Sequence, residues 1–251
     1  MQFVIKVVSL SLMITFLIGC AQTITESNNE ETVSPVLTYN VIYHGNGNTG
    51  GDVPIDANEY SSGNDVKVKE SDGVINIDGI TTAYCFKCWN TMEDGSGIDY
   101  LTGDNFKMPE NDIHLYVQWR PFEVRDTGPA GGIVYDIKAD YSGGFRYMEV
   151  SRTDLSDDAD WDTSGTLCND YELGGYSDWY LPALDDWGKI NVELSDWFLS
   201  DPIGDFKDED YWSSGEGSFN TDAYSFNPVS AFPSRPESKT NKHYVRAIRK
   251  F

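Results

Sequence analysis

The sequence of 251 residues has little of what catalysis and nucleic-acid binding usually require. It contains three histidines, His44, His114 and His243, and no Gly-x-Ser-x-Gly nucleophile motif. Lys and Arg total 18 against 41 Asp and Glu, so the formal charge is −23. Such a charge disfavours contact with nucleic acid and with anionic lipid headgroups. We therefore expect no catalytic site, no metal site, no cofactor and no nucleic-acid partner.

Long apolar runs are also absent. The longest, Val7–Ile18, falls short of the roughly 20 apolar residues of a membrane-spanning helix. It follows the basic Lys6 and ends just before Cys20, which is the order of a secretory signal peptide. The ending Leu17-Ile18-Gly19-Cys20 resembles the bacterial lipobox. This resemblance implies that residues 1–19 are removed as a lipoprotein signal peptide and that Cys20 becomes an acylated N-terminus.

A lipid at Cys20 would hold the chain to a membrane, because each buried methylene of an acyl chain contributes about 0.8 kcal/mol. The alternative is a plain signal peptide followed by an ordinary cysteine. Residues 20–37 are rich in Thr, Ser, Asn and Glu, and we interpret them as a flexible tether. By resemblance to lipoproteins of two-membrane bacteria, Ala21 in place of Asp after the cysteine favours the outer membrane or the cell surface.

Cysteine is scarce. If Cys20 carries lipid, three cysteines remain, an odd number for an oxidising compartment. Cys85 and Cys88 stand three apart in an expected strand, so their side chains point to opposite faces and a disulfide would need a bulge or bend. We interpret Cys85, Cys88 and Cys168 as structural thiols. A local disulfide and redox or metal chemistry are the alternatives.

Aromatic residues and glycine are plentiful, which excludes a disordered acidic chain and favours turn-rich β structure. In residues 38–119 we expect strands over 38–44, 66–68, 84–89 and 114–119. The run Gly45-Asn46-Gly47-Asn48 predicts a turn with positive φ. Trp89 and Trp119 are expected in the core.

Three phrases of this region occur in a fixed order. They are Tyr-x-Val-x-Tyr-x-Gly-Asn-Gly from Tyr39, Phe-x-x-Trp-Asn-Thr from Phe86 and Leu-Tyr-Val-Gln-Trp from Leu115. Together they resemble the Listeria–Bacteroides repeat, also called the InlB B-repeat. The resemblance implies that residues 38–119 form a β-grasp-like module that serves as a spacer or interaction unit on bacterial surfaces. The sequence departs from the repeat at Cys88, where glycine is usual.

A linker rich in Pro and Gly, residues 120–130, precedes a second unit at 131–251. Here we expect strands at 133–135 and 145–150 and a short helix at Leu167–Leu173. The best helical period lies in Asp185–Leu199, where Trp187, Ile190, Leu194 and Trp197 share one face. The chain as a whole is therefore expected to be α+β and mostly β.

Several phrases of the second unit also have a fixed order. They are Gly-Pro-Ala-Gly-Gly-Ile-Val-Tyr (128–135), Phe-Arg-Tyr-Met-Glu-Val (145–150), the run from Leu167 to Pro182, Asp-Tyr-Trp-Ser-Ser (210–214) and Tyr-Val-Arg-Ala-Ile-Arg-Lys-Phe (244–251). They resemble the C-terminal domain of the Legionella collagen-like protein. The resemblance implies a C-type-lectin-like fold related to formylglycine-generating enzymes and, for the collagen-like adhesin, binding of sulfated polysaccharide. Tyr180 departs from the arginine of many relatives.

The aromatic and aliphatic members of these phrases are expected in the core. These are Trp179, Leu181, Pro182, Tyr211, Trp212, Val245 and Ile248. They identify a fold, whereas function must come from a site.

Basic residues concentrate in the last strand region, from Arg235 to Lys250, where Glu237 is the one acid. Arg235, Lys239 and Lys242 are therefore the candidate ligand-binding residues for an anionic ligand. The alternative is that these side chains pair with nearby carboxylates. The acidic run Asp158–Asp162 lacks the glycine and distal glutamate of a calcium loop, so we expect a solvated loop there, with calcium as the alternative.

The sequence thus favours a lipid-anchored, non-catalytic protein of the bacterial cell envelope that binds a glycan or a protein ligand. One alternative is a cell-envelope enzyme or enzyme accessory on a formylglycine-generating-enzyme-like fold. Another is a structural envelope component. A pocket with aromatic walls beside the basic segment would favour binding, whereas His243 beside a serine and a carboxylate would favour catalysis.

Overall fold

The computed structural model describes residues 35–71, 73–77, 81–195, 199–230 and 236–251. Strands dominate these residues, with short helices beside them, so the prediction of an α+β, mostly β chain is confirmed. The signal peptide, Cys20 and Arg235 lie outside the described residues, and what was expected of them stays a prediction. Within the described ranges, no helix has the length and apolarity needed to cross a bilayer.

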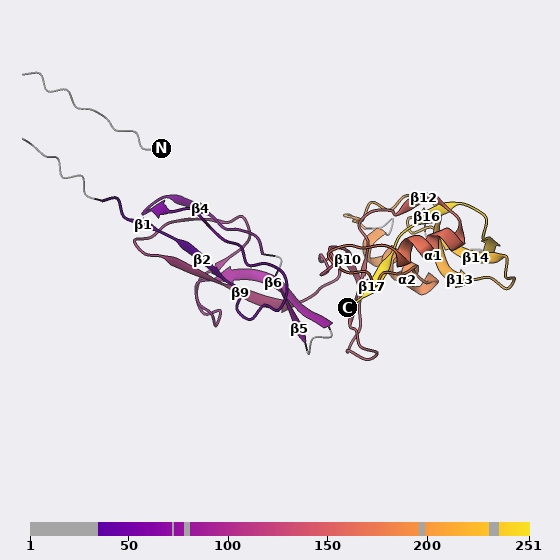
Figure 1. Ribbon diagram of the computed structural model, residues 1–251, viewed down its shortest axis with the longest axis horizontal. Helices are drawn as coiled ribbons and strands as arrows, with labels where there is room; N and C mark the ends of the chain where they lie inside the picture. Colours follow the sequence, from indigo (N-terminus) through magenta and orange to yellow (C-terminus); the bar gives the residue numbers. More distant parts are fainter. Residues whose placement is uncertain (1–34, 72, 78–80, 196–198, 231–235) are drawn as a thin grey trace, which may run out of the picture. The chain divides into compact units, whose positions relative to one another are not determined.

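The region up to Pro121 is built from short antiparallel ladders around one parallel pair (Figure 1). Its main sheet has the order β2-β9-β6-β5, with β7 paired to β6, and β2 runs parallel to β9. Smaller ladders join β1 to β3 and β4 to β8. The strands are β1 (Thr38–Tyr39), β2 (Val41–His44), β3 (Tyr60–Ser61), β4 (Asp65–Lys67), β5 (Val74–Ile77), β6 (Thr81–Asn90), β7 (Asp99–Tyr100), β8 (Asn105–Lys107) and β9 (Ile113–Pro121).

The core of this region follows the period of two expected of half-buried strands. Val41 and Tyr43 of β2 and Leu115 and Val117 of β9 are buried and pack on Trp89 of β6, which is wholly buried. The indole N–H of Trp89 donates to the backbone oxygen of Lys69 at 2.8 Å. The core position expected for Trp89 is confirmed.

The turn after β2 has the geometry that its sequence predicts. Asn46 and Gly47 both have positive φ, 45° and 88°. Trp119 of β9 is half-buried, and its indole N–H donates to the backbone oxygen of Asn46 at 2.8 Å. This hydrogen bond ties the turn to β9.

The described cysteines are free thiols in structural positions. Cys88 and Cys168 are buried and Cys85 is half-buried. The β6–β9 ladder shifts register between Phe86 and Cys88, yet this bulge does not join Cys85 to Cys88. Burial raises the pKa of Cys168 to about 12 and is the main cause that raises the pKa of Cys85 to about 11. Because the thiolate is the reactive form, all three should be inert near neutral pH.

This state of the thiols is directly testable. In folded protein that carries Cys20→Ala, so that Cys85, Cys88 and Cys168 are the cysteines present, a disulfide-forming colour reagent at pH 8 should modify Cys85 slowly and leave Cys88 and Cys168 unmodified. Unfolding in urea should expose all three to rapid reaction, which serves as the internal control. Fewer than three reactive thiols in urea without reductant would reveal a Cys85–Cys88 disulfide instead. Rapid reaction of Cys168 in the folded protein would contradict its burial.

The described residues from Ile133 onward form two sheets. One has the order β10-β11-β17 and the other the order β12-β16-β13-β14-β15, in which β13 and β16 are parallel. Its elements are β10 (Ile133–Ile137), β11 (Tyr147–Val150), β12 (Ser156–Ala159), helix α1 (Trp161–Asn169), helix α2 (Leu184–Ile190), the π-helical turn η1 (Asn191–Ser195), β13 (Tyr211–Glu216), β14 (Asp222–Phe226), β15 (Pro236–Ser238), β16 (His243–Val245) and β17 (Ile248–Lys250).

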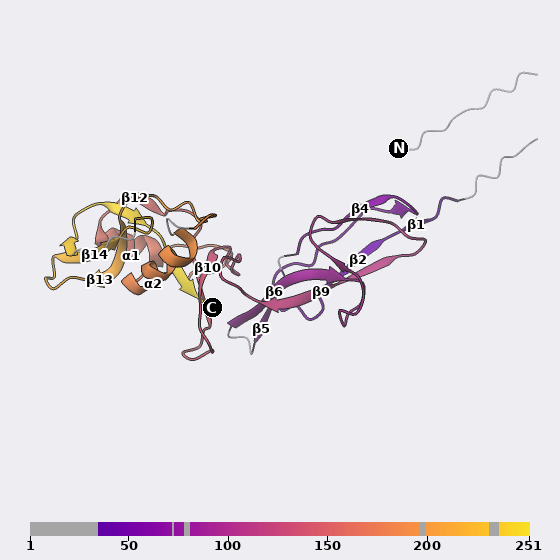
Figure 2. The ribbon, with the colours of Figure 1, turned by 180° about the vertical axis from the view of Figure 1, so that it is seen from behind.

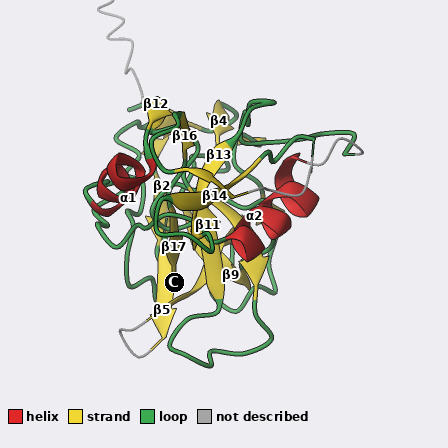
Figure 3. Cartoon of the chain, turned by 90° about the vertical axis from the view of Figure 1, so that its right-hand side faces the viewer, coloured by secondary structure: helices red, strands yellow, loops and turns green. Residues whose placement is uncertain are grey.

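Both faces of the five-stranded sheet are covered. Consecutive residues of a strand point to opposite faces, so Trp212 packs in the core that includes Cys168 of α1, while Tyr211 packs in the core that includes Trp187 of α2. Figure 3 accordingly shows the two helices on either side of β13 and β14, and Figure 2 shows both helices next to these strands from behind. Each fully buried aromatic side chain of this size contributes about 1.5–3 kcal/mol.

The sequence fingerprint of this region is core, as expected. Trp179, Leu181, Pro182, Tyr211, Trp212, Val245 and Ile248 are all buried. The indole N–H of Trp212 donates to the backbone oxygen of Ala159 at 2.8 Å, and that of Trp187 donates to the backbone oxygen of Trp212 at 3.1 Å. The buried indole N–H of Trp179 has no hydrogen-bond partner among the described residues.

Two local predictions were wrong. The helix expected at Leu167–Leu173 is instead α1, which begins six residues earlier at Trp161. Asp160 starts it by accepting the backbone N–H of Thr163, as an N-cap does. It ends before Gly174 and Gly175, whose positive φ values of 59° and 82° suit a turn. The solvated loop expected at Asp158–Asp162 is therefore the end of β12 followed by a helix cap.

The second predicted helix is present but shorter. Helix α2 spans Leu184–Ile190, and the π turn η1 continues it to Ser195. The expected inward face is confirmed for Trp187, Ile190 and Leu194, which are wholly buried. Trp197 lies outside the described residues.

One buried carboxylate connects several of the phrases singled out in the sequence of this region. Glu149 of β11 has no exposed surface and accepts hydrogen bonds from the backbone N–H of Ala130 (3.2 Å) and of Gly132 (2.8 Å). The guanidinium of Arg249 in β17 donates to it at 2.7 Å. A Cβ atom at Gly128 would collide with the carboxylate, which explains a glycine there. The Gly-Pro-Ala-Gly-Gly phrase is thus shaped around Glu149.

Arg249 extends this cluster. It donates to both carboxylate oxygens of Asp178, at 2.7 and 3.2 Å, and lies 4.0 Å from the ring centre of Tyr176. Burial alone would lower the pKa of Arg249, but the hydrogen bonds to Asp178 and Glu149 outweigh it and leave that pKa raised. The guanidinium therefore stays charged, and we name these residues the Glu149–Arg249 cluster.

Breaking this cluster should be costly. Arg249→Met leaves the buried Glu149 carboxylate without its counter-ion, so we expect the free energy of unfolding to fall by about 3–5 kcal/mol. Urea unfolding followed by tryptophan fluorescence measures the loss. The control is Lys207→Met, at an exposed position, which should change stability by no more than about 0.5 kcal/mol. Equal midpoints for the two variants would contradict a structural role for the ion pair.

Candidate ligand-binding cleft on helix α1

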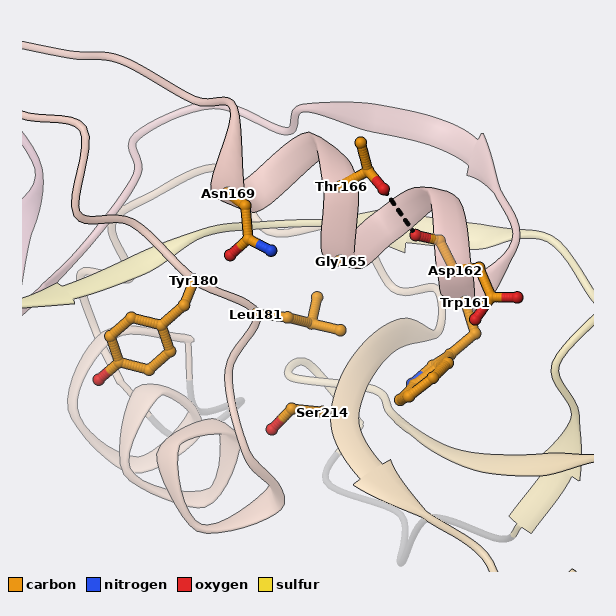
Figure 4. A pocket seen from close by; sticks show the side chains of 8 residues that line it. All are labelled: Trp161, Asp162, Gly165, Thr166, Asn169, Tyr180, Leu181 and Ser214. Carbon is orange, nitrogen blue, oxygen red and sulfur yellow. Dashed lines mark hydrogen bonds between the residues drawn. The ribbon is translucent and has the colours of Figure 1, made fainter. Parts of the chain in front are cut away.

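A hollow of about 450 Å³ lies beside α1. This volume falls within the range of small-molecule sites. We call it the α1 cleft, and its lining residues are Trp161, Asp162, Gly165, Thr166, Asn169, Tyr180, Leu181 and Ser214 (Figure 4). Helix α1, the segment before Pro182 and strand β13 thus each supply part of the wall.

The helical period explains which residues of α1 face the cleft. Trp161, Gly165 and Asn169 are four residues apart, so they lie one above another on one side of the helix. Asp162 and Thr166 form the neighbouring row. A Cβ atom at Gly165 would meet nothing within 4 Å, so the glycine leaves the middle of the cleft open.

Trp161 is held rigidly at one end of the cleft. Its indole N–H donates to the backbone oxygen of Ser213 at 2.8 Å, and its backbone N–H donates to the oxygen of Lys239 at 3.0 Å. The Lys239 ammonium lies 3.9 Å from the indole ring centre, close enough for a cation–π contact. A half-buried aromatic ring fixed in this way offers a platform that loses little entropy when a ligand packs against it.

Leu181 and Tyr180 also line the cleft. Figure 4 shows Leu181 between Tyr180 and Trp161, with the Tyr180 hydroxyl pointing away from the other labelled side chains. Burial raises the pKa of Tyr180 far above its usual value, and the hydroxyl has no hydrogen-bond partner among the described residues. The Tyr180 ring packs against the core that includes Trp187, so Tyr180 borders the cleft while its side chain points away from it and its hydroxyl keeps its proton.

The polar groups of the cleft are mostly neutral. Thr166, Asn169 and Ser214 are exposed and offer hydroxyl and amide groups, and Asp162 supplies the one carboxylate of the lining. Thr166 uses its hydroxyl to donate to the backbone oxygen of Asp162 at 3.2 Å. Apolar surface bordered by neutral donors and acceptors suits an uncharged polar ligand better than an anion.

The predicted ligand-binding lysines already have partners. Lys239 pairs with Glu216 at 2.7 Å, and Lys242 pairs with Asp160 at 2.9 Å. Asp160 is held ionised, because hydrogen bonds from Thr163 and then Lys242 keep the pKa of its carboxyl well below the usual range. An anionic ligand at Lys239 or Lys242 would have to compete with these carboxylates. Arg235, the third predicted residue, lies outside the described part of the chain.

The other basic residues of this segment are used in the fold. Arg246 is buried and pairs with Asp154, and it donates to the backbone oxygens of Ser151 and Gly204, each at 2.7 Å. Arg249 belongs to the Glu149–Arg249 cluster. Lys250 is exposed, with its amine 4.7 Å from the Phe145 ring centre. Four basic side chains of this segment therefore pair with carboxylates, as the alternative interpretation of the sequence expected. They are Lys239, Lys242, Arg246 and Arg249.

The sequence missed the α1 cleft although the signal was present. Trp161, Gly165 and Asn169 have helical spacing, but the helix was expected further along the chain. Only the structure shows that Lys239, singled out as a ligand contact, instead supports the tryptophan of the cleft.

Comparisons with known proteins give partial matches. No protein-family model matches the chain. A protein of Evansella cellulosilytica named "Putative Gly-rich membrane protein" is 33% identical over 100 residues, which cover 36% of this chain and 11% of that protein. A second protein of the same organism, named "Putative membrane protein", is 36% identical over 75 residues, covering 27% of this chain and 11% of its own length. The matched part is thus about a tenth of each relative.

Proposed function

We propose that this protein is a lipid-anchored, non-catalytic binding protein of the bacterial cell surface that recognises a glycan in the α1 cleft. In this proposal Cys20 carries the lipid, residues 20–37 are the tether, an InlB B-type repeat at 38–119 is the spacer and a C-type-lectin-like domain at 131–251 is the head. The names of the two Evansella proteins support an envelope location.

The observation that carries the proposal is the rigid, half-buried Trp161 beside neutral polar groups. Sugars present apolar C–H faces between hydroxyl groups, so they fit an aromatic platform flanked by donors and acceptors. Thr166, Asn169 and Ser214 provide such groups next to Trp161. The cleft also lies beside Lys239, where the sequence placed the ligand.

The chemistry of the cleft favours a neutral glycan over the sulfated polysaccharide of the collagen-like adhesin. Its lining contains the carboxylate of Asp162 and no lysine or arginine. The nearby ammonium of Lys239 is compensated by Glu216. A sulfate would therefore meet repulsion from Asp162 without a free cation to offset it.

The enzyme alternative needs His243 between a serine and a carboxylate. The structure does bring these residue types together, but in another order: Ser225 donates its hydroxyl to Glu237 at 2.5 Å, and His243 lies 3.0 Å from the same carboxylate oxygen. Ser225 is also buried. A general base must accept the proton of the nucleophile, and here the serine hydroxyl points to the carboxylate instead of the imidazole. We therefore favour binding.

The cleft can be tested by filling it. Gly165→Leu places a bulky side chain in its open middle, so we expect loss of glycan binding on an array of neutral, sulfated and uronic glycans. The matched control is Gly188→Leu on α2, where an added Cβ also meets nothing within 4 Å. Both changes replace a helical glycine with a strong helix former, so both variants should fold. The control should bind like the unchanged protein.

The array also separates the alternatives. Neutral glycans bound with little dependence on salt support the proposal. Salt-sensitive binding of sulfated glycans that is lost on reversing Lys239 and Lys242 to Glu would return the site to these lysines. No bound glycan at all would remove the glycan proposal and leave a protein ligand or a structural role.

The membrane anchor is tested separately. Cys20→Ala removes the acylated atom, so the variant should leave the membrane fraction when cells are separated into membrane and soluble parts. The unchanged protein should stay with membranes and partition into detergent. A Cys20→Ala protein that still sediments with membranes would show that another feature of the chain holds it there.

A further inference from the structure

A second cluster of side chains in this region has no role in the α1 cleft. Asp210, Glu237 and His243 each present one ligand atom, and these three atoms lie within 4.8 Å of one another. The closest pair is His243 Nε2 and Glu237 Oε1, 3.0 Å apart. None of the three residues lines the α1 cleft. The sequence predicted no metal site.

The sheet itself brings the three residues together. Backbone pairing of Tyr211 with Tyr244 sets β13 beside β16, and Tyr244 N–H donates to the oxygen of Asp210 at 3.0 Å. Asp210 and His243 each stand two residues before a core residue, Trp212 and Val245, so they are expected on the same face of the sheet. Paired strands position side chains more precisely than loops do.

Glu237 is oriented by its own neighbours. Its Oε1 atom accepts the Ser225 hydroxyl at 2.5 Å, and its Oε2 atom accepts the Asn241 amide N–H at 2.8 Å. Ligating carboxylates in metal sites are typically held by such hydrogen bonds. The carboxylate is thus fixed before any ion arrives.

His243 offers a nitrogen whose bonding capacity is poorly used. Its ring packs edge-on against Trp212, with ring centres 4.5 Å apart. Nε2 is buried and lies 3.0 Å from Oε1 of Glu237, at angles outside ordinary hydrogen-bond geometry. An ion between the two side chains would engage this nitrogen and the carboxylate at once.

We propose that Asp210, Glu237 and His243 bind a divalent transition-metal ion of the zinc class. One imidazole and two carboxylates form a ligand set that zinc accepts, whereas calcium prefers six to eight oxygen atoms. Asp210 is exposed, so water can complete the coordination. The two carboxylates offset the charge of the ion.

The ion would also brace the edge of the α1 cleft. Glu237 and His243 flank the turn that contains Lys239 and Lys242. Lys239 contacts both the backbone N–H and the ring of Trp161. Metal binding would therefore fix the turn that supports the aromatic wall of the cleft.

The test measures metal binding by the purified full chain. After treatment with a chelator, the protein is titrated with Zn²⁺ by calorimetry, and Co²⁺ is added in parallel because its visible absorption reports bonding to protein ligands. We expect one ion per chain. His243→Gln should weaken zinc binding by about 100-fold, and Ser225→Ala, which removes a hydrogen bond to a ligand, by about 10-fold.

Matched controls distinguish this site from the rest of the chain. His44 and His114 are the other two histidines of the chain, and their ring nitrogens lie 2.8 Å apart. Because neither belongs to the proposed site, His114→Gln should leave zinc binding unchanged. Asp210→Asn at an exposed position should weaken binding without loss of fold, whereas the neighbouring change Glu209→Gln should not. The proposal is overturned if no zinc binds, or if binding survives His243→Gln and is lost in His114→Gln.

Discussion

The buried contact between Glu149 and Arg249 is the constraint on which the second region depends. A carboxylate without exposed surface is tolerable only when its charge is paired and its oxygens are hydrogen-bonded. Arg249, Ala130 and Gly132 meet that requirement. These residues come from the last strand and from the loop before β10, so the Glu149 carboxylate fixes segments that are far apart in sequence. The Gly-rich loop is the consequence, since only glycine leaves space at position 128.

The same cluster positions the wall of the α1 cleft. Arg249 donates hydrogen bonds to Asp178 and contacts the Tyr176 ring. Two residues after Asp178, the backbone N–H groups of Tyr180 and Ile248 each donate to the backbone oxygen of the other at 2.9 Å. The alternation of this stretch then sends Trp179 and Leu181 to one core and Tyr180 to the other. A binding surface thus follows directly from the packing of the core, and α1 completes it from the opposite side.

The sequence predicts the fold class because strands with period two and turn-forming glycines are local signals. The core positions of Trp212 and Val245 follow from the same patterns. The start of α1 could not be recognised in this way, since Asp160 acts as a cap only if the following turn becomes helical, and the acidic residues around it concealed the cap. The Asp210–Glu237–His243 cluster was hidden for another reason: its members meet through pairing between distant strands, which no spacing along the chain reports.

Scarcity of positive charge determines how this acidic protein uses its basic residues. With 18 Lys and Arg against 41 Asp and Glu, a cation on the surface has many carboxylates within reach. Lys239 and Lys242 pair with Glu216 and Asp160. Arg246 and Arg249 are buried and pair with Asp154 and Glu149. An anionic ligand would have to displace these partners and then meet the long-range repulsion of the remaining charge. A neutral ligand meets neither cost, and a divalent cation is attracted by the same field that repels an anion. The charge balance and the local geometry therefore favour the same two kinds of ligand.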